Sequence, residues 1–568
     1  MWFMSQRRFK IIIWLLFLLI LGQCGWWGVG RVAWLVASFQ QGADPASALK
    51  LPPMLPPEAA IATQWLPDDP DTGRVMEDFT RQQLTSDYGR AWLQWNLSLK
   101  IGRPYNLHTS FSGPALHYLT TSISTTENIK IDQIDTAHQL QLHFYAADGS
   151  IVALTDTQAE IYQMIYDADG EIVSAQWLYA RYEIVMLLQD GTWRIRHWVR
   201  HELPTPIEPS YQPRPQLLQV NQQQLQLADQ PFIARGVNYY PSKTPWLQFW
   251  PAYQPQQTTK DLALVQQLNL NSVRIFIPFE QFTEPYSTSL YLRSVTDFLD
   301  QADQANIKVI VTLFDFLGDY QLARWQATDS YLTTVVTALR EHPAIMAWDV
   351  KNEPDRDYAT ASQVVVEAWL QHSIRQLRRL DPHHLITIGW STPEAAERLY
   401  QDVDLVSFHY YGSTELLATH YQRLRQVVGE KPLLLTEIGM PTWNSPFFPH
   451  GHNQREQANY LTGLMQQAEA YNGFLIWTLF DIPEVPKAVA GFWPWQRGPQ
   501  TQLGLYNETY EPKLISKVLL GLEPSPFIRW WEAWLKPFRI TLIVLSMLGL
   551  IGGWQGYRRW KRKKHPKI

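Results

Sequence analysis

The chain has 568 residues, of which 46% are hydrophobic and 18% charged, a composition that excludes a disordered or fibrous protein. Its one cysteine, Cys24, excludes an intramolecular disulfide bond and a zinc site built from cysteines. The net charge is −5, and because basic residues gather at the two ends, the body of the chain is strongly acidic. An acidic body is untypical of a nucleic-acid-binding protein.

Both ends of the chain carry apolar stretches beside basic residues. Arg7, Arg8 and Lys10 precede residues 11–30, and the basic run RRWKRKK follows residues 540–557. Each stretch approaches the ~20 apolar residues that span a bilayer, and the positive-inside rule places the basic flanks in the cytoplasm. The sequence therefore predicts two transmembrane helices in the cell membrane, with both termini cytoplasmic and the bulk of the chain extracytoplasmic. A cleaved signal peptide is the alternative for the first stretch.

Proline clusters divide the chain between these ends. Residues 41–70 and 204–215 are predicted linkers on either side of an α+β domain at 71–203. This domain starts with a helical pattern and ends with two strands joined by Asp190-Gly191, a strong hairpin signal. The order resembles the cystatin-like, nuclear-transport-factor-2-like fold. We interpret the domain as a spacer or as a docking module for a protein partner, and a glycan or partner pocket is the alternative.

From residue 216 onward, apolar β runs alternate with helical stretches. This alternation predicts a parallel sheet covered on both faces. Eight such units in about 290 residues fit a (β/α)8 barrel. The predicted strands are Ile233–Tyr239, Ser272–Phe276, Lys308–Phe314, Ala344–Val350, Leu385–Gly389, Leu405–Tyr410, Leu433–Thr436 and Gly473–Phe480.

The predicted fold class is thus α/β, with a (β/α)8 barrel, a smaller α+β domain and terminal transmembrane helices. The predicted organisation in chain order is a cytoplasmic tip and transmembrane helix (1–40), a linker (41–70), the α+β domain (71–203), a linker (204–215), the barrel domain (216–525) and an interfacial segment with a transmembrane helix and basic tail (526–568).

Active sites of (β/α)8 barrels form at the C-terminal ends of the strands, so polar residues at these positions are the candidates. Glu353 ends the fourth strand and Glu437 the seventh, which places two carboxylates across the barrel mouth. A carboxylate pair is the minimum apparatus for cleaving a glycosidic bond, because one protonates the leaving oxygen and the other attacks the anomeric carbon. We expect Arg274 and the Tyr411 hydroxyl to keep Glu437 ionised.

Further polar and aromatic residues are predicted to contact the substrate. Asn352 is expected to donate to the sugar 2-hydroxyl, His409 to bind the sugar or orient the acid, and Trp477 to form a floor under the reacting ring. Asn238 and Asp315 are candidates for sugar contacts; the alternative is that they have a structural role in their loops. No metal-ligand spacing or phosphate-binding loop is found, so we expect neither a metal nor another cofactor.

These motifs resemble clan A of the glycoside hydrolases, especially the cellulase-like family 5. The resemblance covers about residues 216–522. It implies that Glu353 is the acid/base and Glu437 the nucleophile, with their carboxyl groups ~5–5.5 Å apart. The matching positions are Arg274 after strand 2, Asn352-Glu353-Pro354 after strand 4, His409-Tyr410-Tyr411 on strand 6, Glu437 on strand 7 and Trp477 on strand 8.

The chain departs from this pattern after the third strand. Cellulase-like members often carry a histidine there, whereas residues 312–316 contain none, and Asp315 is a candidate to bind a sugar hydroxyl instead. The segment 235–240 (RGVNYY) also resembles family 2 and mannanase-type relatives, so the family within the clan stays open.

The sequence therefore predicts a membrane-anchored, extracytoplasmic retaining β-glycosidase that hydrolyses a β-linked oligosaccharide or polysaccharide. One alternative is a transglycosylase that remodels a cell-wall or exported polysaccharide. Another is a non-catalytic glycan-binding scaffold. The predicted partners are the β-linked glycan and the lipid bilayer, but no nucleic acid.

Overall fold

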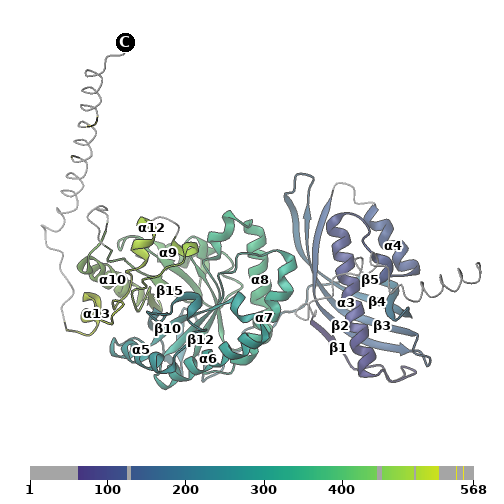
Figure 1. The fold of residues 1–568 in the computed structure, drawn as a ribbon, viewed down its shortest axis with the longest axis horizontal. Coiled ribbons are helices and arrows are strands. Elements are labelled where there is room, and N and C mark those ends of the chain that lie inside the picture. Colours follow the sequence, from purple (N-terminus) through teal and green to yellow (C-terminus); the bar gives the residue numbers. More distant parts are fainter. Residues whose placement is uncertain are drawn as a thin grey trace, which may run out of the picture. The chain divides into compact units, whose positions relative to one another are not determined.

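A computed structural model describes residues 62–124, 129–443, 451–490 and 494–522, together with Leu545 and Trp554 (Figure 1). The chain forms two compact units. Most of the described residues before Leu203 belong to the first, and those from Leu203 onward, with short segments at 161–164 and 174–179, belong to the second.

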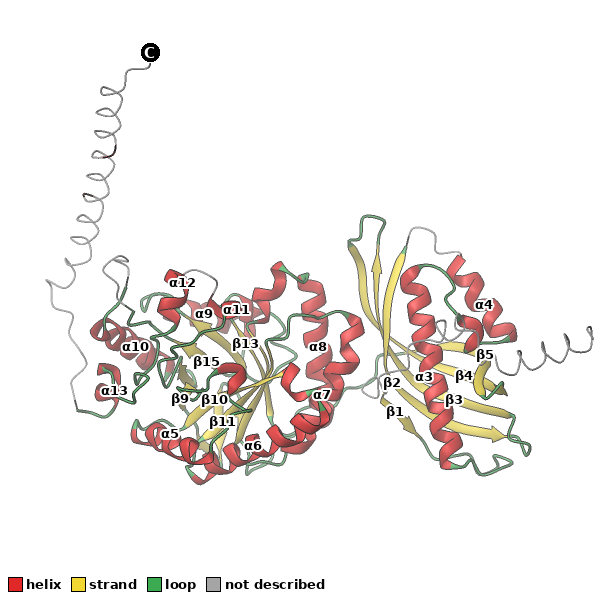
Figure 2. Ribbon diagram, viewed as in Figure 1, coloured by secondary structure: helices red, strands yellow, loops and turns green. Residues whose placement is uncertain are grey.

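The first unit is a five-stranded sheet in the order β1-β2-β3-β4-β5, with helices α3 and α4 on one face (Figure 2). The hairpin between the last two strands has the predicted turn, because Asp190 and Gly191 both have positive φ. The short first strand, β1, lies inside the predicted linker 41–70 and pairs in parallel with β2. The likeness to the nuclear-transport-factor-2-like fold stays a prediction. The elements are β1 (Ala62–Trp65), α3 (Asp78–Ile101), α4 (Gly113–Ser124), β2 (Lys130–Tyr145), β3 (Ile151–Tyr166), β4 (Ile172–Gln189) and β5 (Thr192–Leu203).

A buried ionic cluster lies between this sheet and helix α3. The Nδ1 atom of His138 lies 2.6 Å from Asp156 and its Nε2 atom 3.0 Å from Asp135. Tyr88 donates to the same oxygen of Asp156, and Trp92 packs against the imidazole with ring centroids 5.2 Å apart. Burial lowers the pKa of His138, but the charges and hydrogen bonds of the two aspartates outweigh it and raise the pKa to about 9.

We expect the first unit to lose stability as the pH rises from about 6.5 through 9, because folded His138 then gives up its proton. The contribution of protonated His138 to the free energy of unfolding is roughly 3 kcal/mol. It is fully present below the pKa that His138 has in the unfolded chain. Urea unfolding of the full chain at several pH values, with hydrogen exchange of peptides from residues 130–203, measures it. His138→Gln should remove the pH dependence, whereas His143→Gln, at a partly exposed imidazole of the same sheet, should keep it. An unchanged slope in His138→Gln would contradict the assignment.

The second unit is a closed barrel of eight parallel strands, β9 to β16, wrapped by helices (Figures 1 and 2). The predicted (β/α)8 barrel is confirmed. Its strands are β9 (Ala234–Asn238), β10 (Ser272–Pro278), β11 (Lys308–Asp315), β12 (Ile345–Asn352), β13 (Leu385–Trp390), β14 (Val406–Tyr410), β15 (Leu433–Ile438) and β16 (Gly473–Ile476). The described helices are α5 (Pro255–Gln267), α6 (Pro285–Gln304), α7 (Trp325–Leu339), α8 (Gln363–Leu380), α9 (Leu417–Val428), α10 (Gln454–Ala468), α11 (Lys487–Ala490), α12 (Pro494–Gln500) and α13 (Leu514–Leu519).

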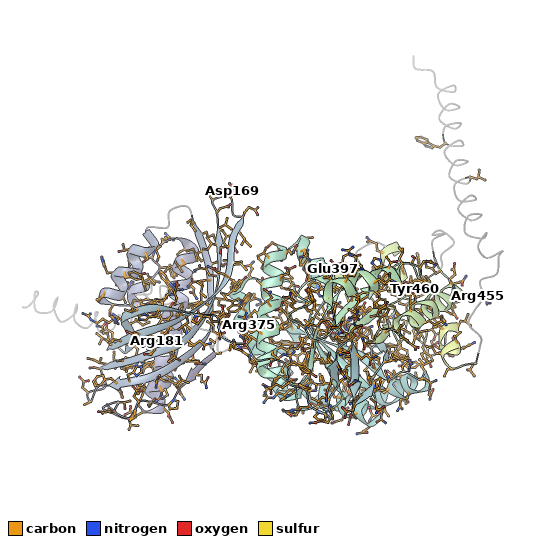
Figure 3. All side chains as sticks on the ribbon, turned by 180° about the vertical axis from the view of Figure 1, so that it is seen from behind. Asp169, Arg181, Arg375, Glu397, Arg455 and Tyr460 are labelled. Atoms are coloured by element: carbon orange, nitrogen blue, oxygen red, sulfur yellow. The ribbon has the colours of Figure 1, made fainter. Side chains whose placement is uncertain are left out.

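A three-stranded sheet closes the N-terminal end of the barrel. It consists of β6 (Gln219–Asn221), β7 (Gln224–Leu227) and β8 (Gln230–Pro231). Leu218 and Leu225 of this segment pack into an apolar cluster with buried residues of the barrel strands. Buried apolar side chains from the strands and the surrounding helices form the core of this unit, and Figure 3 draws the described side chains as sticks. Because the N-terminal end is sealed with apolar groups, polar chemistry is left to the opposite end.

The prediction of terminal transmembrane helices is corrected. A spanning helix needs ~20 consecutive, mostly apolar residues. Among the described residues, no helix combines the length and the apolar character needed to cross a membrane. The predicted spans 11–30 and 540–557 lie outside the described residues, apart from Leu545 and Trp554. The supported fold class is the (β/α)8 barrel with the α+β unit, and the bilayer as a partner is not supported. The extracytoplasmic location stays a prediction.

Candidate active site

A buried arginine organises the C-terminal end of the barrel. Arg274 on β10 is completely shielded from solvent and its guanidinium binds four side chains. Its Nη1 donates to Glu437 at 2.6 Å and to Asn238 at 3.1 Å, and its Nη2 donates to Asn352 at 2.9 Å. The Nε and Nη2 atoms both donate to one oxygen of Asp349, at 3.0 and 2.7 Å. One planar cation thus fixes residues from strands β9, β12 and β15 relative to one another.

Asp349 is in turn held by the neighbouring strands. Thr312 on β11 donates its hydroxyl to the oxygen that binds Arg274, at 2.8 Å. The backbone N–H of Gly389 on β13 donates to the other oxygen, also at 2.8 Å. A Cβ atom at Gly389 would lie 2.7 Å from Nη2 of Arg274 and 3.0 Å from Asp349. The ion pair therefore requires glycine at this position.

Glu437, at the end of β15, receives hydrogen bonds on both oxygens. Arg274 donates to Oε1, and the Tyr411 hydroxyl donates to Oε2 at 2.9 Å. The Nδ1 atom of His409 also lies 3.4 Å from Oε2. These donors stabilise a carboxylate anion in a buried setting.

Glu353 lies across the mouth, directly after β12, with φ at +47°. Its Oε1 atom lies 3.0 Å from Nδ1 of His409, and Nη1 of Arg356 donates to its Oε2 at 2.7 Å. Burial raises the pKa of Glu353, but the hydrogen bond and charge of His409, followed by those of Arg356, outweigh it. The pKa is therefore held below its usual range. The side chain remains 18% exposed, so it faces the opening.

The two glutamates and His409 form a compact trio. One potential ligand atom of each residue lies within 4.8 Å of the others. Among the described residues, this is the group with the donor types and spacing that could hold a metal ion. Nδ1 of His409 lies 3.0 Å from Oε1 of Glu353 and 3.4 Å from Oε2 of Glu437, so the imidazole connects the two carboxylates.

The structure places two predicted sugar-binding residues at different depths. Asn238 is fully buried, and its amide is used inside the protein: Oδ1 accepts from Arg274, and Nδ2 donates to the Thr436 carbonyl at 2.9 Å. Asn238 therefore positions the arginine rather than lining the opening. Asn352 is partly buried and offers only Oδ1 to Arg274, which leaves its amide nitrogen for a ligand.

Asp315 ends β11 beside the catalytic strands. The Tyr240 hydroxyl donates to it at 3.2 Å. Burial raises the pKa of Asp315 to about 6, although the charges of Lys351 and Arg274 act against it. The residues on either side, Phe314 and Phe316, have φ of +50° and +62°. An irregular backbone at the strand end thus carries this carboxylate.

Trp477, directly after β16, belongs to an aromatic cluster at the barrel mouth. Its ring centroid lies 5.8 Å from Trp246, 5.9 Å from Phe276 and 6.4 Å from Tyr240. Phe276 also lies under the Arg274 guanidinium, 4.6 Å from ring centroid to Cζ. The cluster offers an apolar surface of the kind on which sugar rings stack.

The structure brings together Arg274, Asn352, Glu353, His409, Tyr411 and Glu437, as expected for strand ends that meet at one face. The sequence analysis missed Asp349, Thr312, Gly389 and Arg356. The alternation of side chains along β12 could have indicated Asp349, because this residue faces the barrel interior and pairs in register with Thr312 on the neighbouring strand. The sequence held no signal for the steric requirement at Gly389.

We expect Gly389→Ala to lower kcat/KM by roughly 10²-fold, because the new methyl group displaces the guanidinium that orients Glu437. The substitution removes no polar group, so a loss of activity reports the displacement of the Arg274 guanidinium alone. Turnover of a β-glycoside by the full chain measures it. Gly318→Ala is the matched control, since that glycine is exposed, has no positive φ and would contact nothing. Equal activities of both variants would contradict the role given to the ion pair.

Comparison with known proteins supports this picture of the barrel. Residues 228–479 match the family model Cellulase (glycosyl hydrolase family 5), so the chain contains a family 5-like (β/α)8 domain. A probable mannan endo-1,4-beta-mannosidase C of Aspergillus terreus is 35% identical over 74 residues, which are 11% of this chain and 18% of that protein. A beta-glucuronidase of Pongo abelii is 28% identical over 225 residues, which are 34% of each chain. The chain thus spans about a third or less of the length of these relatives.

Among solved structures, the exo-beta-1,4-mannosidase Op5Man5 from Opitutaceae bacterium strain TAV5 is similar to this chain. The two are 20% identical with a TM-score of 0.43, over 51% of this chain and 59% of that one.

Proposed function

We propose that the chain is a retaining β-glycosidase in which Glu437 is the nucleophile and Glu353 the general acid and base. The separation of the two carboxylates carries the proposal, since an oxygen of each lies within 4.8 Å of the other. Retaining enzymes hold these groups about 5–5.5 Å apart, whereas inverting enzymes leave ~6.5–9.5 Å for a water molecule. The short separation supports direct attack by Glu437.

The family 5 match and the mannosidase and glucuronidase relatives support a β-linked glycoside as the substrate. We take this to be a β-linked oligosaccharide or polysaccharide. The aromatic cluster around Trp477 suits the apolar face of a sugar ring, and the Asn352 amide nitrogen suits a hydroxyl group.

The reaction has two balanced steps. In the first, a carboxylate oxygen of Glu437 bonds to the anomeric carbon, the bond to the leaving oxygen breaks, and that oxygen takes the proton of Glu353. In the second, Glu353 removes a proton from water, the water oxygen bonds to the anomeric carbon, and Glu437 leaves as a carboxylate. Arg274 and Tyr411 donate hydrogen bonds to Glu437, whose carboxylate attacks in the first step and leaves in the second.

Glu353 must carry a proton when the first step begins. In the empty site, His409 and Arg356 hold its pKa below the usual range and favour the anion. A bound glycoside removes water from the opening and separates the exposed arginine from the carboxylate, and both changes raise the pKa of Glu353. The acid role therefore depends on substrate binding.

We expect Glu353→Gln and Glu437→Gln each to lower kcat by at least roughly 10²-fold on aryl β-glycosides and β-linked polysaccharides. The assay uses the full chain, and NMR of the first product tests whether the β anomer is released. Glu280→Gln is the control, since among the described residues this exposed glutamate forms its ion pair with Arg324, away from both catalytic carboxylates, and the variant should keep full activity.

Release of the α anomer would contradict the retaining mechanism. Transfer to added acceptor sugars in excess of hydrolysis would favour the transglycosylase. If no substrate is turned over and fluoro-sugar inactivators fail to label Glu437, the glycosidase proposal is wrong and a glycan-binding scaffold takes its place.

A further inference from the structure

The two oxygens of Glu353 are held by very different partners. His409, which binds Oε1, is fully buried and fixed on strand β14. Arg356, which binds Oε2, stands on a short 3-10 helix (Pro354–Ala359), and its side chain is 64% exposed. Oε2 is therefore the oxygen of Glu353 that a substrate can reach. To reach it, the substrate has to displace only the exposed side chain of Arg356.

The proton transfer proposed above needs this movement. The leaving oxygen has to come within ~2.6–3.2 Å of the acid, which is the space that Nη1 of Arg356 occupies at 2.7 Å. A guanidinium at this distance also favours the anion of Glu353, whereas the reaction needs the neutral acid. Arg356 and the leaving group thus compete for Oε2.

The displaced guanidinium would still feel the charges of Asp355 and Glu437, but Glu353 is the one described carboxylate that accepts a hydrogen bond from it. Asp355 accepts from the backbone and hydroxyl of Ser391. Asp357 accepts from the Tyr320 hydroxyl and lies 3.6 Å from Lys351. Once Glu353 is protonated, the permanent positive charge of Arg356 stands beside the leaving group without its hydrogen-bonded carboxylate. The planar guanidinium of an arginine binds a carboxylate more strongly than it binds a neutral hydroxyl group, because its five donors match the two carboxylate oxygens.

On the basis of the glycosidase function, we propose that Arg356 is a specificity-determining residue that binds a carboxylate on the leaving-group side of the substrate. It covers the proton-donating oxygen of the empty enzyme and turns to the carboxylate when the substrate binds. The substrate class is a β-glycoside whose leaving part is acidic, such as one that ends in a uronic acid.

The test compares two substrates with the sugar that the enzyme prefers, β-linked to either 4-hydroxybenzoate or 4-hydroxybenzamide. The leaving groups have nearly the same shape and differ in charge. We expect wild-type full-length protein to favour the carboxylate, and Arg356→Gln to reduce the ratio of the two kcat/KM values by roughly tenfold or more. Differences in leaving-group reactivity cancel when this ratio is compared between proteins. Arg356→Lys should retain part of the preference, because it keeps the charge but not the fork.

The pH profile gives a second measurement. Arg356 lowers the pKa of Glu353, so Arg356→Gln should move the alkaline limb of kcat/KM to higher pH with both substrates. Arg398→Gln is the matched control, because this exposed arginine binds Glu367 at 2.9 Å and neither catalytic carboxylate. It should change neither the ratio nor the profile.

The outcomes separate the inference from the function on which it rests. An active enzyme whose substrate ratio is the same in wild type and Arg356→Gln would overturn the role of Arg356 alone. Absence of turnover and of covalent labelling in the wild type would overturn the glycosidase function and this inference together.

Discussion

The site depends on one buried guanidinium that two carboxylates share. Taking the charge of Arg274 out of water costs several kcal/mol, and only partners with good geometry offset this cost. Asp349 supplies one partner and is itself held by Thr312 and by the backbone of Gly389. Glu437 supplies the other. Glu437 is therefore part of the charge balance of the barrel, and its position follows from the strand that carries the arginine.

The two glutamates differ in what surrounds them, and this difference is consistent with the roles proposed for them. The fully buried Arg274 donates to one oxygen of Glu437, and the partly exposed Tyr411 donates to the other. Glu353 shares His409 with Glu437 on one oxygen but has the exposed Arg356 on the other. A nucleophile needs a stable anion, whereas an acid needs surroundings that can change between two protonation states. The barrel thus fixes one carboxylate and leaves the other adjustable.

Much of this arrangement could be predicted from the sequence. The eight apolar runs predicted the barrel, and the rule that parallel strand ends share one face brought Glu353 and Glu437 together. The role of Asn238 could not be predicted, because its amide donates to the Thr436 carbonyl on β15. That contact exists only once the barrel brings β9 and β15 together. Terminal apolar stretches suggested spanning helices that the described residues do not support. The first strand, β1, lay hidden in a proline-rich segment because its pairing partner is far along the chain.

The strand end at Asp315 shows why a residue-by-residue match leaves specificity open. Cellulase-like members often carry a histidine after this strand, whereas this chain has two phenylalanines at positive φ on either side of Asp315. Such conformations cost of order 1–3 kcal/mol each and persist only where packing determines them. The Phe314 ring supplies that packing, with centroids 4.7 Å from Tyr331 and 4.8 Å from Trp369. The helix layer thus enforces the turn that presents Asp315 to Tyr240, so aromatic packing behind the strand helps to position this candidate sugar-binding residue.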